Sequence, residues 1–407
     1  MTSNPTASAA DLASLTVADL AVTAEEHWPH YAEDEVDGVV AALRSGKVNQ
    51  WTGSKVVEFQ AAYEQYVGHG RHAIALTNGS VALELALRAF GVGEGDEVIV
   101  TPRTFVASAS CVRLVGATPV FADVDPESGN ITPATIEAVV TDRTKGVIPV
   151  HLAGWPADMH GINAVAKQHE LFVLEDCAQA HGAEIDGQPV GSFSEAAAFS
   201  FCQDKIMSTG GEGGLTLFRD EPAYRWAWEY KDHGKSLDKI RDKHPAPGFR
   251  WLHDSVGTNW RMLEMSAVIG IAQLGKLDEW RAARTERANV WRTAFDGIDG
   301  LRVPQLPEGI THAEYKFYSY VERGVESEAL RNEIVARAGA RGIRAFSGSC
   351  SEVYLEDAFG DLHVDRLPVA RRLGETSLMF EVHPTLDLER LRLRAAVVAE
   401  IAREVLA

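Results

Sequence analysis

Short apolar runs alternate with longer amphipathic stretches along the first half of the chain. The amphipathic stretches carry apolar residues at helical spacing, as in Val81–Phe90, Thr104–Val115, Thr132–Val140 and Gly161–His169. Seven apolar runs have the length of buried strands: Ala73–Thr77, Glu97–Thr101, Pro119–Val124, Gly146–Leu152, Leu171–Cys177, Ala196–Cys202 and Leu215–Phe218. This alternation predicts βαβ units, and therefore an α/β fold with a mostly parallel, seven-stranded sheet covered by helices.

Helical spacing also marks the sequence on both sides of this region. We expect further elements in chain order: helices over Glu33–Leu43 and Gly53–Val67, one long helix over Arg261–Thr293, a strand over Tyr315–Glu322, a helix over Ser327–Ala340 with Ser327 as its N-cap, and a terminal helix over Leu388–Leu406. Three parts follow: an N-terminal arm over residues 1–27 with a composition typical of disorder, a large domain over residues 28–260, and a connecting helix with a smaller α/β C-terminal domain over residues 261–407.

The composition is that of a globular protein, with 45% hydrophobic and 24% charged residues. A formal net charge of -19 argues against binding to nucleic acid or to an anionic membrane through a general electrostatic field. The four cysteines form no C-x-x-C pair, which fits a reducing compartment. Neither a secretion signal nor a membrane-spanning run is recognisable, so we expect a cytoplasmic protein.

One lysine lies between an apolar run and a cluster of glycines, in Phe199-Ser-Phe-Cys-Gln-Asp-Lys205-Ile-Met-Ser-Thr-Gly-Gly-Glu-Gly-Gly214. The apolar run predicts a strand that ends shortly before Lys205, beside a tight backbone. A partly desolvated lysine can act as a neutral amine and form a Schiff base with a carbonyl group. A surface lysine in a loop explains this stretch equally well.

The segment Thr77-Asn-Gly-Ser80 connects a predicted strand to a predicted helix. Backbone N–H groups and a hydroxyl at such a helix start form an anion site. Glu84 and Arg88 are spaced for the exposed face of that helix. The alternative is an ordinary turn with Ser80 as an N-cap, and the spacing fits neither a Walker loop nor G-x-G-x-x-G.

A third segment, Glu175-Asp-Cys-Ala-Gln-Ala-His-Gly182, lies at the carboxyl end of a predicted strand, where open α/β sheets bind ligands. Its acids, thiol and histidine could serve as metal ligands. Because Glu175 and Asp176 are neighbours on a strand, they point to opposite faces, and at most one reaches the site. We therefore expect no metal, and instead a buried acid that pairs with a protonated ring nitrogen.

These segments, in this order, resemble those of the DegT/DnrJ/EryC1/StrS sugar aminotransferases, a family of fold-type I pyridoxal 5'-phosphate (PLP) enzymes. The resemblance extends from about Trp28 to the C-terminus. It is carried by the three segments above and by five others: Gly95-Asp-Glu-Val-Ile-Val100, Thr104-Phe-Val-Ala107, Gly116-Ala-Thr-Pro-Val-Phe121, His151-Leu-Ala-Gly154 and Asn259-Trp-Arg-Met262.

The resemblance implies four contacts to the body of the cofactor. Lys205 would hold PLP as a Schiff base, and Asp176 would pair with the pyridinium nitrogen so that PLP remains an electron sink. Gln179 would reach the ring hydroxyl, and Phe105 would stack on the ring face. Without the family pattern, Phe105 reads as a core residue.

The resemblance also implies a phosphate cup shared between two subunits. Gly79, Ser80 and Ser200 would hold the phosphate, and Asn259 would contribute from the neighbouring subunit of a homodimer. From the residues alone, Ser200 could be an ordinary strand hydroxyl and Asn259 a helix cap.

The implied activity is transfer of an amino group from glutamate or glutamine to a keto-sugar. The favoured acceptor is a nucleotide-linked keto-deoxysugar for surface polysaccharide or natural-product biosynthesis. The basic segment Glu229–His253 is the candidate contact for its diphosphate, and the alternative is that this segment is a solvated loop. Many family members carry histidine where this chain has Cys202, which leaves a keto-cyclitol or an aminohydroxybenzoate-type carbocycle open. Dehydratase relatives replace the lysine by histidine, so Lys205 favours amino transfer. A non-catalytic PLP-binding regulator is the alternative of another class.

Overall fold

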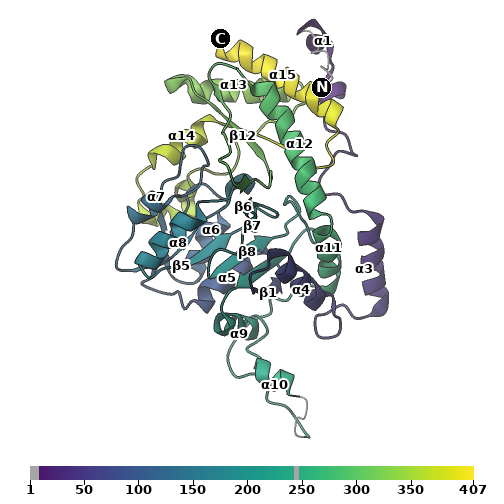
Figure 1. Ribbon diagram of the computed structural model, residues 1–407, viewed down its shortest axis with the longest axis vertical. Helices are drawn as coiled ribbons and strands as arrows, with labels where there is room; N and C mark the ends of the chain where they lie inside the picture. The colour runs from purple at the N-terminus through teal and green to yellow at the C-terminus, as the bar shows by residue number, and fades with distance from the viewer. Residues whose placement is uncertain (1–8, 243–246) are drawn as a thin grey trace.

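The computed structural model describes residues 9–242 and 247–407, with side chains from residue 12 onward. A seven-stranded sheet in the order β1-β9-β8-β5-β4-β2-β3 lies at its centre, with helices packed around it (Figure 1). Only β9 runs antiparallel to its neighbours. The strands are β1 His72–Leu76, β2 Glu97–Val100, β3 Thr118–Phe121, β4 Thr144–Ile148, β5 Phe172–Asp176, β8 Ala196–Ser200 and β9 Gly214–Phe218. The predicted mostly parallel sheet of seven strands is confirmed.

The carboxyl ends of three strands meet at one edge of this sheet. Asp176 ends β5 and Ser200 ends β8, and these strands are parallel neighbours. β9 returns in the opposite direction, so its first residue, Gly214, pairs with Ser200 on one side and with Leu76 of β1 on the other. This topology brings together the three sequence segments expected to carry chemistry.

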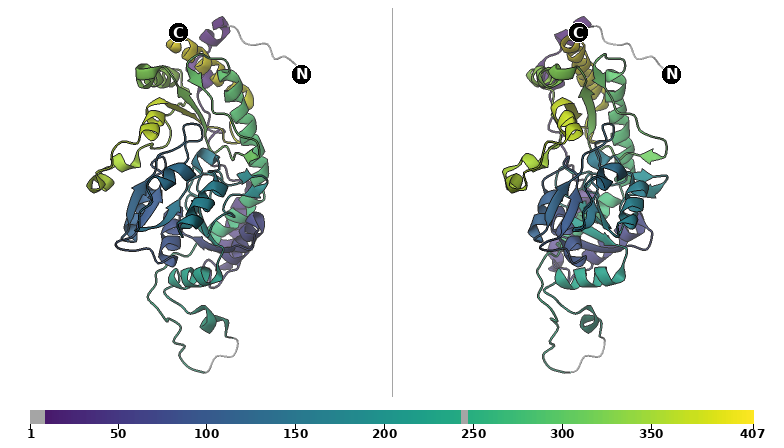
Figure 2. Two further views of the ribbon diagram at one scale, coloured as in Figure 1. Left: turned by 60° about the vertical axis from the view of Figure 1, so that its left-hand side comes forward. Right: turned by 90° about the vertical axis from the view of Figure 1, so that its left-hand side faces the viewer.

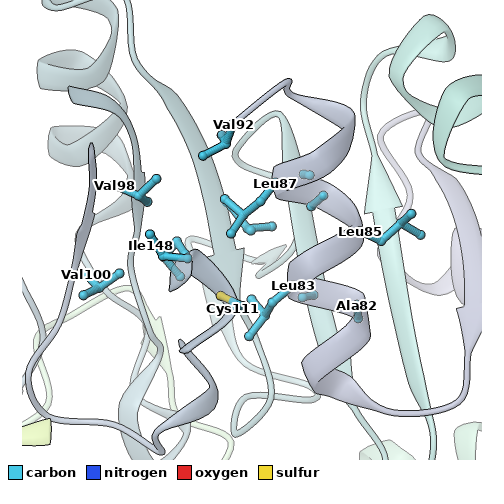
Figure 3. Packing of buried hydrophobic residues seen from close by; sticks show 14 of the residues in the cluster. Ala82, Leu83, Leu85, Leu87, Val92, Val98, Val100, Cys111 and Ile148 are labelled. Carbon is cyan, nitrogen blue, oxygen red and sulfur yellow. The ribbon is translucent and has the colours of Figure 1, made fainter. Parts of the chain in front are cut away.

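Helix α5 (Gly79–Ala89) is apolar on most of its surface, and it is therefore buried between the sheet and other helices. Figure 3 shows Leu83 and Leu87 pointing from α5 toward Ile148 of the sheet, while Leu85 points to the opposite side. This packing fixes the start of α5 at the sheet edge, where the site lies.

This part of the chain contains nine further helices among the described residues. They are α3 Glu33–Ser45, α4 Lys55–Val67, α6 Ala107–Leu114, α7 Pro133–Glu137, η1 Leu152–Gly154, α8 Met159–Gln168, α9 Glu221–Tyr230, α10 Leu237–Arg241 and α11 Glu264–Leu274. A separate small sheet contains β11 Ile310–Thr311, β6 Glu184–Ile185 and β7 Gln188–Pro189. The segment that contains α10 projects away from the rest of the molecule (Figure 2).

A second hydrophobic core lies around a three-stranded sheet of β10 Leu301–Arg302, β12 Phe317–Val321 and β13 Ser377–Phe380. Trp291 stacks on Phe380 there, with ring centres 4.0 Å apart. The helices of the C-terminal part are α12 Leu277–Phe295, η2 Gly324–Glu326, α13 Ser327–Ala340, η3 Val353–Leu355, η4 Asp357–Leu362, α14 Pro368–Thr376 and α15 Leu388–Leu406. Val353 and Phe359 of this part pack into the core beneath the large sheet, so the domain boundary at residue 260 stays a prediction.

The N-terminal arm contains helices in the part that the structure describes, whereas its composition alone suggested possible disorder. Two short helices, α1 Ala9–Ser14 and α2 Val17–Leu20, lie against α15 (Figure 1). Leu20 is completely buried, and the Glu26 carboxylate forms a buried ion pair with Arg394. Residues 1–8 lie outside the described part.

The single long helix expected over Arg261–Thr293 is two helices, α11 and α12, which separate at Gly275 and Lys276. The two helices pack against different parts of the molecule. Helix α11 packs against α3 and α4, whereas α12 packs on α15. The Lys276 ammonium lies 2.8 Å from the carboxylate of Asp34, which ties the break to α3.

Two side-chain predictions are also wrong. Ser327 is the first residue of α13 rather than its N-cap, and its hydroxyl accepts a hydrogen bond from the backbone N–H of Arg323. Glu84 is buried instead of exposed, because α5 is packed between the sheet and other helices, and its carboxylate pairs with the half-buried Arg88 guanidinium at 2.7 Å. Within the described ranges, no helix is long and apolar enough to cross a bilayer.

Candidate active site

A cavity of about 570 Å³ opens at the carboxyl edge of the large sheet. It is lined by residues that follow β1, β5 and β8 and by the start of α6. Seven of the eight predicted cofactor residues are among them: Gly79, Ser80, Phe105, Asp176, Gln179, Ser200 and Lys205. The structure thus brings together positions spread over more than a hundred residues of sequence.

Asp176, the last residue of β5, is a buried acid at the floor of the cavity. Its Oδ2 accepts a hydrogen bond from the hydroxyl of Ser108 (2.7 Å), and its Oδ1 accepts one from the N–H of Ala178 (3.1 Å). Burial raises the pKa of Asp176, while these hydrogen bonds and the charge of Lys205 act in the opposite direction. Ser108 was missed in the sequence because a serine inside an apolar helix carries no signal of its own.

The neighbouring Glu175 points to the other side of β5, as the alternation of a strand requires. His151, Glu175 and Cys177 place ligand atoms within 4.8 Å of one another among the described residues. The Glu175 carboxylate, however, already accepts hydrogen bonds from three backbone N–H groups and from the Ser194 hydroxyl. A carboxylate used in this way supports the strand end, and we propose no metal there.

His181 has a structural role as well. Its Nε2 donates to the backbone oxygen of Ser200 at 2.8 Å, which leaves Nδ1 to accept from the hydroxyl of Tyr63 at 2.8 Å. Burial lowers the pKa of His181 to about 4, so the ring is neutral at neutral pH. The hydrogen bond from His181 thus fixes the last residue of β8.

Gln179 presents a donor to the cavity. Its side-chain oxygen accepts from the N–H of Ala153 at 2.7 Å, which fixes the orientation of the amide. The amide nitrogen is therefore available as a donor on the cavity side, as a ring hydroxyl would require.

Lys205 follows β8 in a turn that is held from outside the site. Its backbone oxygen accepts a hydrogen bond from the indole of Trp28 at 2.8 Å. The side chain is 13% exposed, and Nζ lies 3.8 Å from the carboxylate of Asp204 and 5.1 Å from the centre of the Tyr315 ring. The amine thus reaches the cavity within a partly desolvated setting.

Asp204 and Tyr315 form a pair beside that amine. Burial raises the pKa of Asp204, but the charge of Lys205 and a hydrogen bond from the Tyr315 hydroxyl outweigh it, and the pKa lies below its ordinary value. Tyr315 comes from the C-terminal part of the chain, so no local pattern could have placed it here.

The turn into α5 has the features of an anion site. The Asn78 side chain caps the helix by accepting from the N–H of Val81 at 3.0 Å, so Asn78 rather than Ser80 is the N-cap. Gly79 and Ser80 then occupy the first turn, where backbone N–H groups favour anions. A Cβ atom on Gly79 would lie only 2.7 Å from Cβ of Ser200, so only glycine lets the two hydroxyl-bearing segments approach.

Phe105 and Asn259 differ from the other predicted positions. Phe105 is 63% exposed at the rim of the cavity, so its interpretation as a core residue is wrong. Asn259 is exposed, does not line the cavity of its own chain, and lies four residues before Leu263, the N-cap of α11. It is therefore no helix cap.

The basic segment after α9 is largely neutralised by acids of its own. Lys231 is completely buried, and it pairs with Asp232 at 3.4 Å; Lys235 and Arg261 also contact Asp232. Because Lys231 is buried and paired, it does not contact a diphosphate. Arg241 remains exposed, and Lys243 lies outside the described residues.

This donor set fits PLP. It offers an amine, a buried acid, an amide donor and a glycine-dependent anion site around one cavity of suitable size. A mostly parallel sheet with these groups at its carboxyl edge defines a fold-type I transferase. The chain belongs to the DegT/DnrJ/EryC1/StrS aminotransferase family, whose sequence model matches residues 29–400, and it is an aminotransferase.

Two curated relatives match most of the chain. A GDP-perosamine synthase from Caulobacter vibrioides is 37% identical over 367 residues, which cover 89% of this chain and 95% of that protein. A 3-amino-5-hydroxybenzoate synthase from Amycolatopsis mediterranei is 36% identical over 335 residues, or 82% and 84% of the two chains.

Two solved structures have the same fold over nearly their whole length. An aminotransferase from Psychrobacter cryohalolentis superposes with a TM-score of 0.90 at 48% identity and covers 94% of this chain and 99% of its own. A Streptococcus pneumoniae protein in its PMP form gives a TM-score of 0.85 at 26% identity, with 93% and 98% coverage.

Proposed function

We propose that this aminotransferase uses PLP to move an amino group from glutamate or glutamine to a keto-sugar, with a nucleotide-linked keto-deoxysugar as the favoured acceptor. The observation that carries the cofactor assignment is that Lys205 and Asp176 line the same cavity as the turn into α5, where backbone N–H groups favour an anion. The PMP form of the related Streptococcus pneumoniae protein supports it.

The chain's own residues would share the work as follows. PLP, when bound, supplies an electron sink next to the reacting carbon. Lys205 would hold the cofactor covalently and, once released by the donor amine, would move protons to and from the reacting carbon. Asp176 would hold the proton on the ring nitrogen, Gln179 would donate to the ring hydroxyl, and Phe105 would cover one ring face. Gly79, Ser80 and Ser200 would bind the phosphate.

The acceptor is proposed from the relatives. The GDP-perosamine synthase favours a nucleotide-linked sugar, whereas the 3-amino-5-hydroxybenzoate synthase keeps a carbocycle as second candidate. Cys202, where many family members carry histidine, lines the cavity and supports keeping this second candidate.

We also propose a cytoplasmic homodimer with shared active sites. Asn259 is exposed and does not line the cavity of its own chain, and the segment with α10 projects from the molecule (Figure 2), as expected of parts that contact a second copy. Asn259 would complete the phosphate cup of the partner. All four cysteines are free, which fits a reducing compartment.

The test separates the donor reaction from the acceptor reaction. Purified PLP-loaded protein is mixed with glutamate or glutamine, and conversion of the cofactor is followed by absorbance. The aminated enzyme is then offered keto-sugar nucleotides and keto-cyclitols. Amination of a nucleotide-linked sugar supports the favoured acceptor, and amination of a cyclitol alone replaces it with the second candidate. Failure of both amino donors to convert bound PLP would contradict glutamate and glutamine as the amino donors.

A diphosphate-bearing acceptor makes a further demand on the exposed Arg241. Arg241→Ala should weaken binding of a nucleotide-linked acceptor and leave the glutamate reaction unchanged, because a charge-assisted hydrogen bond to phosphate would be lost. Arg225→Ala is the matched control, since Arg225 already pairs with Asp238. Equal effects of both substitutions would count against a diphosphate contact at Arg241.

A further inference from the structure

Two hydroxyl groups form a buried chain that ends on the Asp176 carboxylate. Ser108, in the first turn of α6, is 1% exposed, and its Oγ lies 2.7 Å from Oδ2 of Asp176. The Oγ1 of Thr104, also 1% exposed, lies 2.8 Å from the same Ser108 oxygen. Neither residue belongs to the predicted cofactor contacts.

The chemistry of the groups fixes the direction of these hydrogen bonds. An ionised carboxylate only accepts, so Ser108 donates its proton to Asp176. The Ser108 oxygen is then an acceptor, and the remaining donor is the hydroxyl of Thr104. The other carboxylate oxygen is held by the N–H of Ala178, so both oxygens of Asp176 have a donor from the protein.

Thr104, at the outer end of this chain of hydrogen bonds, is held by a distant part of the sequence. The backbone N–H of Thr104 donates to the carbonyl of Cys350 at 3.0 Å, and the N–H of Val353 donates to the carbonyl of Pro102 at 3.0 Å. The loop that presents Thr104 is therefore held at two points by the segment from Cys350 to Val353. This gives the Thr104 hydroxyl one defined position from which it can orient Ser108.

We propose that Ser108, oriented by Thr104, is a positioning residue that keeps the Asp176 carboxylate ionised and aimed at the ring nitrogen of the cofactor. Burial by itself favours the neutral acid, and a neutral acid would leave the ring nitrogen without its anionic partner. A hydrogen bond donated to the carboxylate stabilises the charged form, and such charge-assisted bonds are the strong kind. The inference rests on the proposed PLP site.

The test reads the proton on the ring nitrogen directly. Apoprotein is reconstituted with PLP that carries ¹⁵N in the ring, and the ¹⁵N resonance and the dissociation constant of PLP are measured for the wild type, Ser108→Ala, Ser108→Thr and Thr104→Val. The free energy of unfolding of each apoprotein is measured alongside, so that a general loss of stability is recognised.

We expect the wild-type resonance in the range of a protonated ring. Ser108→Ala should move it toward the value of neutral pyridine and raise the dissociation constant roughly ten-fold, the loss typical of a hydrogen bond to a charged group. Ser108→Thr keeps the hydroxyl and should restore both values. Thr104→Val should shift the resonance in the same direction by a smaller amount.

A wild-type resonance and affinity in Ser108→Ala would overturn the proposal, even if that variant were less stable, because Ser108 would then be only structural. If Ser108→Ala does not fold, Thr104→Val decides, and an unchanged resonance in that variant contradicts the directed chain. Failure of the cofactor assignment looks different, because the wild type itself would then bind no PLP.

Discussion

A Cβ atom on Gly214 would lie 2.1 Å from the carbonyl oxygen of Asn78. Gly214 is the first residue of β9, and it pairs with Leu76 just before the turn that leads into α5. The strand therefore crosses directly beside the backbone that forms the anion site. Part of the glycine cluster after Lys205 is explained by this contact, since any side chain at position 214 would push that backbone away.

Gly214→Ala should accordingly damage the phosphate site. The methyl group meets backbone rather than a flexible side chain, so we expect the free energy of unfolding to fall by about 2–3 kcal/mol and PLP to bind at least ten-fold more weakly. Gly339→Ala is the control, because Gly339 lies inside α13 with no atom near its added Cβ, and it should stabilise the protein by about 0.5–1 kcal/mol. Denaturant unfolding and PLP titration provide the two readouts. Normal PLP affinity in Gly214→Ala would contradict the account.

Asp176→Asn removes the anion that would pair with the ring nitrogen but keeps the shape of the side chain. We expect PLP still to bind and turnover to fall by orders of magnitude, because the carboxylate acts mainly on the charge that develops during reaction. Single-turnover kinetics with glutamate measure this loss. Near-normal rates would move the role to another residue.

The sequence predicted the seven strands of the large sheet because each is a short apolar run between turn signals, and it predicted the terminal helix α15 at its observed bounds. It did not predict the burial of the N-terminal arm, because Leu20 and Glu26 gain their partners from the far end of the chain. The break between α11 and α12 was missed for a similar reason, because it depends on packing partners that are distant in sequence: α3 and α4 for α11, and α15 for α12.

The candidate site shows the same limit. Seven predicted cofactor residues share the cavity, because each lies in a segment that follows a strand or opens a helix at one sheet edge. Ser108 and Tyr315 were missed, because their contacts to Asp176 and Asp204 join distant parts of the chain. The roles of all these residues remain predictions.

The Glu26–Arg394 pair should make stability depend on acid pH. Burial raises the pKa of Glu26, but hydrogen bonds and charge from Arg394, together with backbone N–H groups, lower it from 4.5 to about 2. A lowered pKa means that the stabilisation is complete above pH 4.5 and is lost as the pH falls toward 2. Glu26→Gln should therefore cost roughly 3 kcal/mol at neutral pH, partly by leaving a buried guanidinium unpaired.

Unfolding of wild type and Glu26→Gln across this pH range tests the assignment, and the difference between them should shrink steadily below pH 4.5. Glu389→Gln breaks the exposed pair with Arg392 and should cost less than about 1 kcal/mol. A constant difference between wild type and Glu26→Gln at all pH values would rule out the ion pair as its cause.

The shared-site homodimer predicts complementation. Lys205→Ala should be inactive, and Asn259→Asp should impair activity by placing a negative charge beside the phosphate of the partner's cofactor. A heterodimer of these variants would contain one site with both changes and one site with neither. Co-expressed variants should therefore recover a substantial fraction of activity. If mass measurement confirms heterodimers that are as inactive as the parents, Asn259 acts within its own chain or not at all.

The identity of the lysine that carries PLP tests the account most directly. Lys316 is a useful comparison, because its Nζ lies 5.2 Å from the Tyr315 ring centre and burial lowers its pKa. The PLP-loaded protein is reduced with borohydride, digested and mapped by mass spectrometry. We predict that the added mass lies on the peptide with Lys205, disappears in Lys205→Ala and persists in Lys316→Met. A label on Lys316 or any other lysine of the wild type, or an unchanged label in Lys205→Ala, would contradict the central claim.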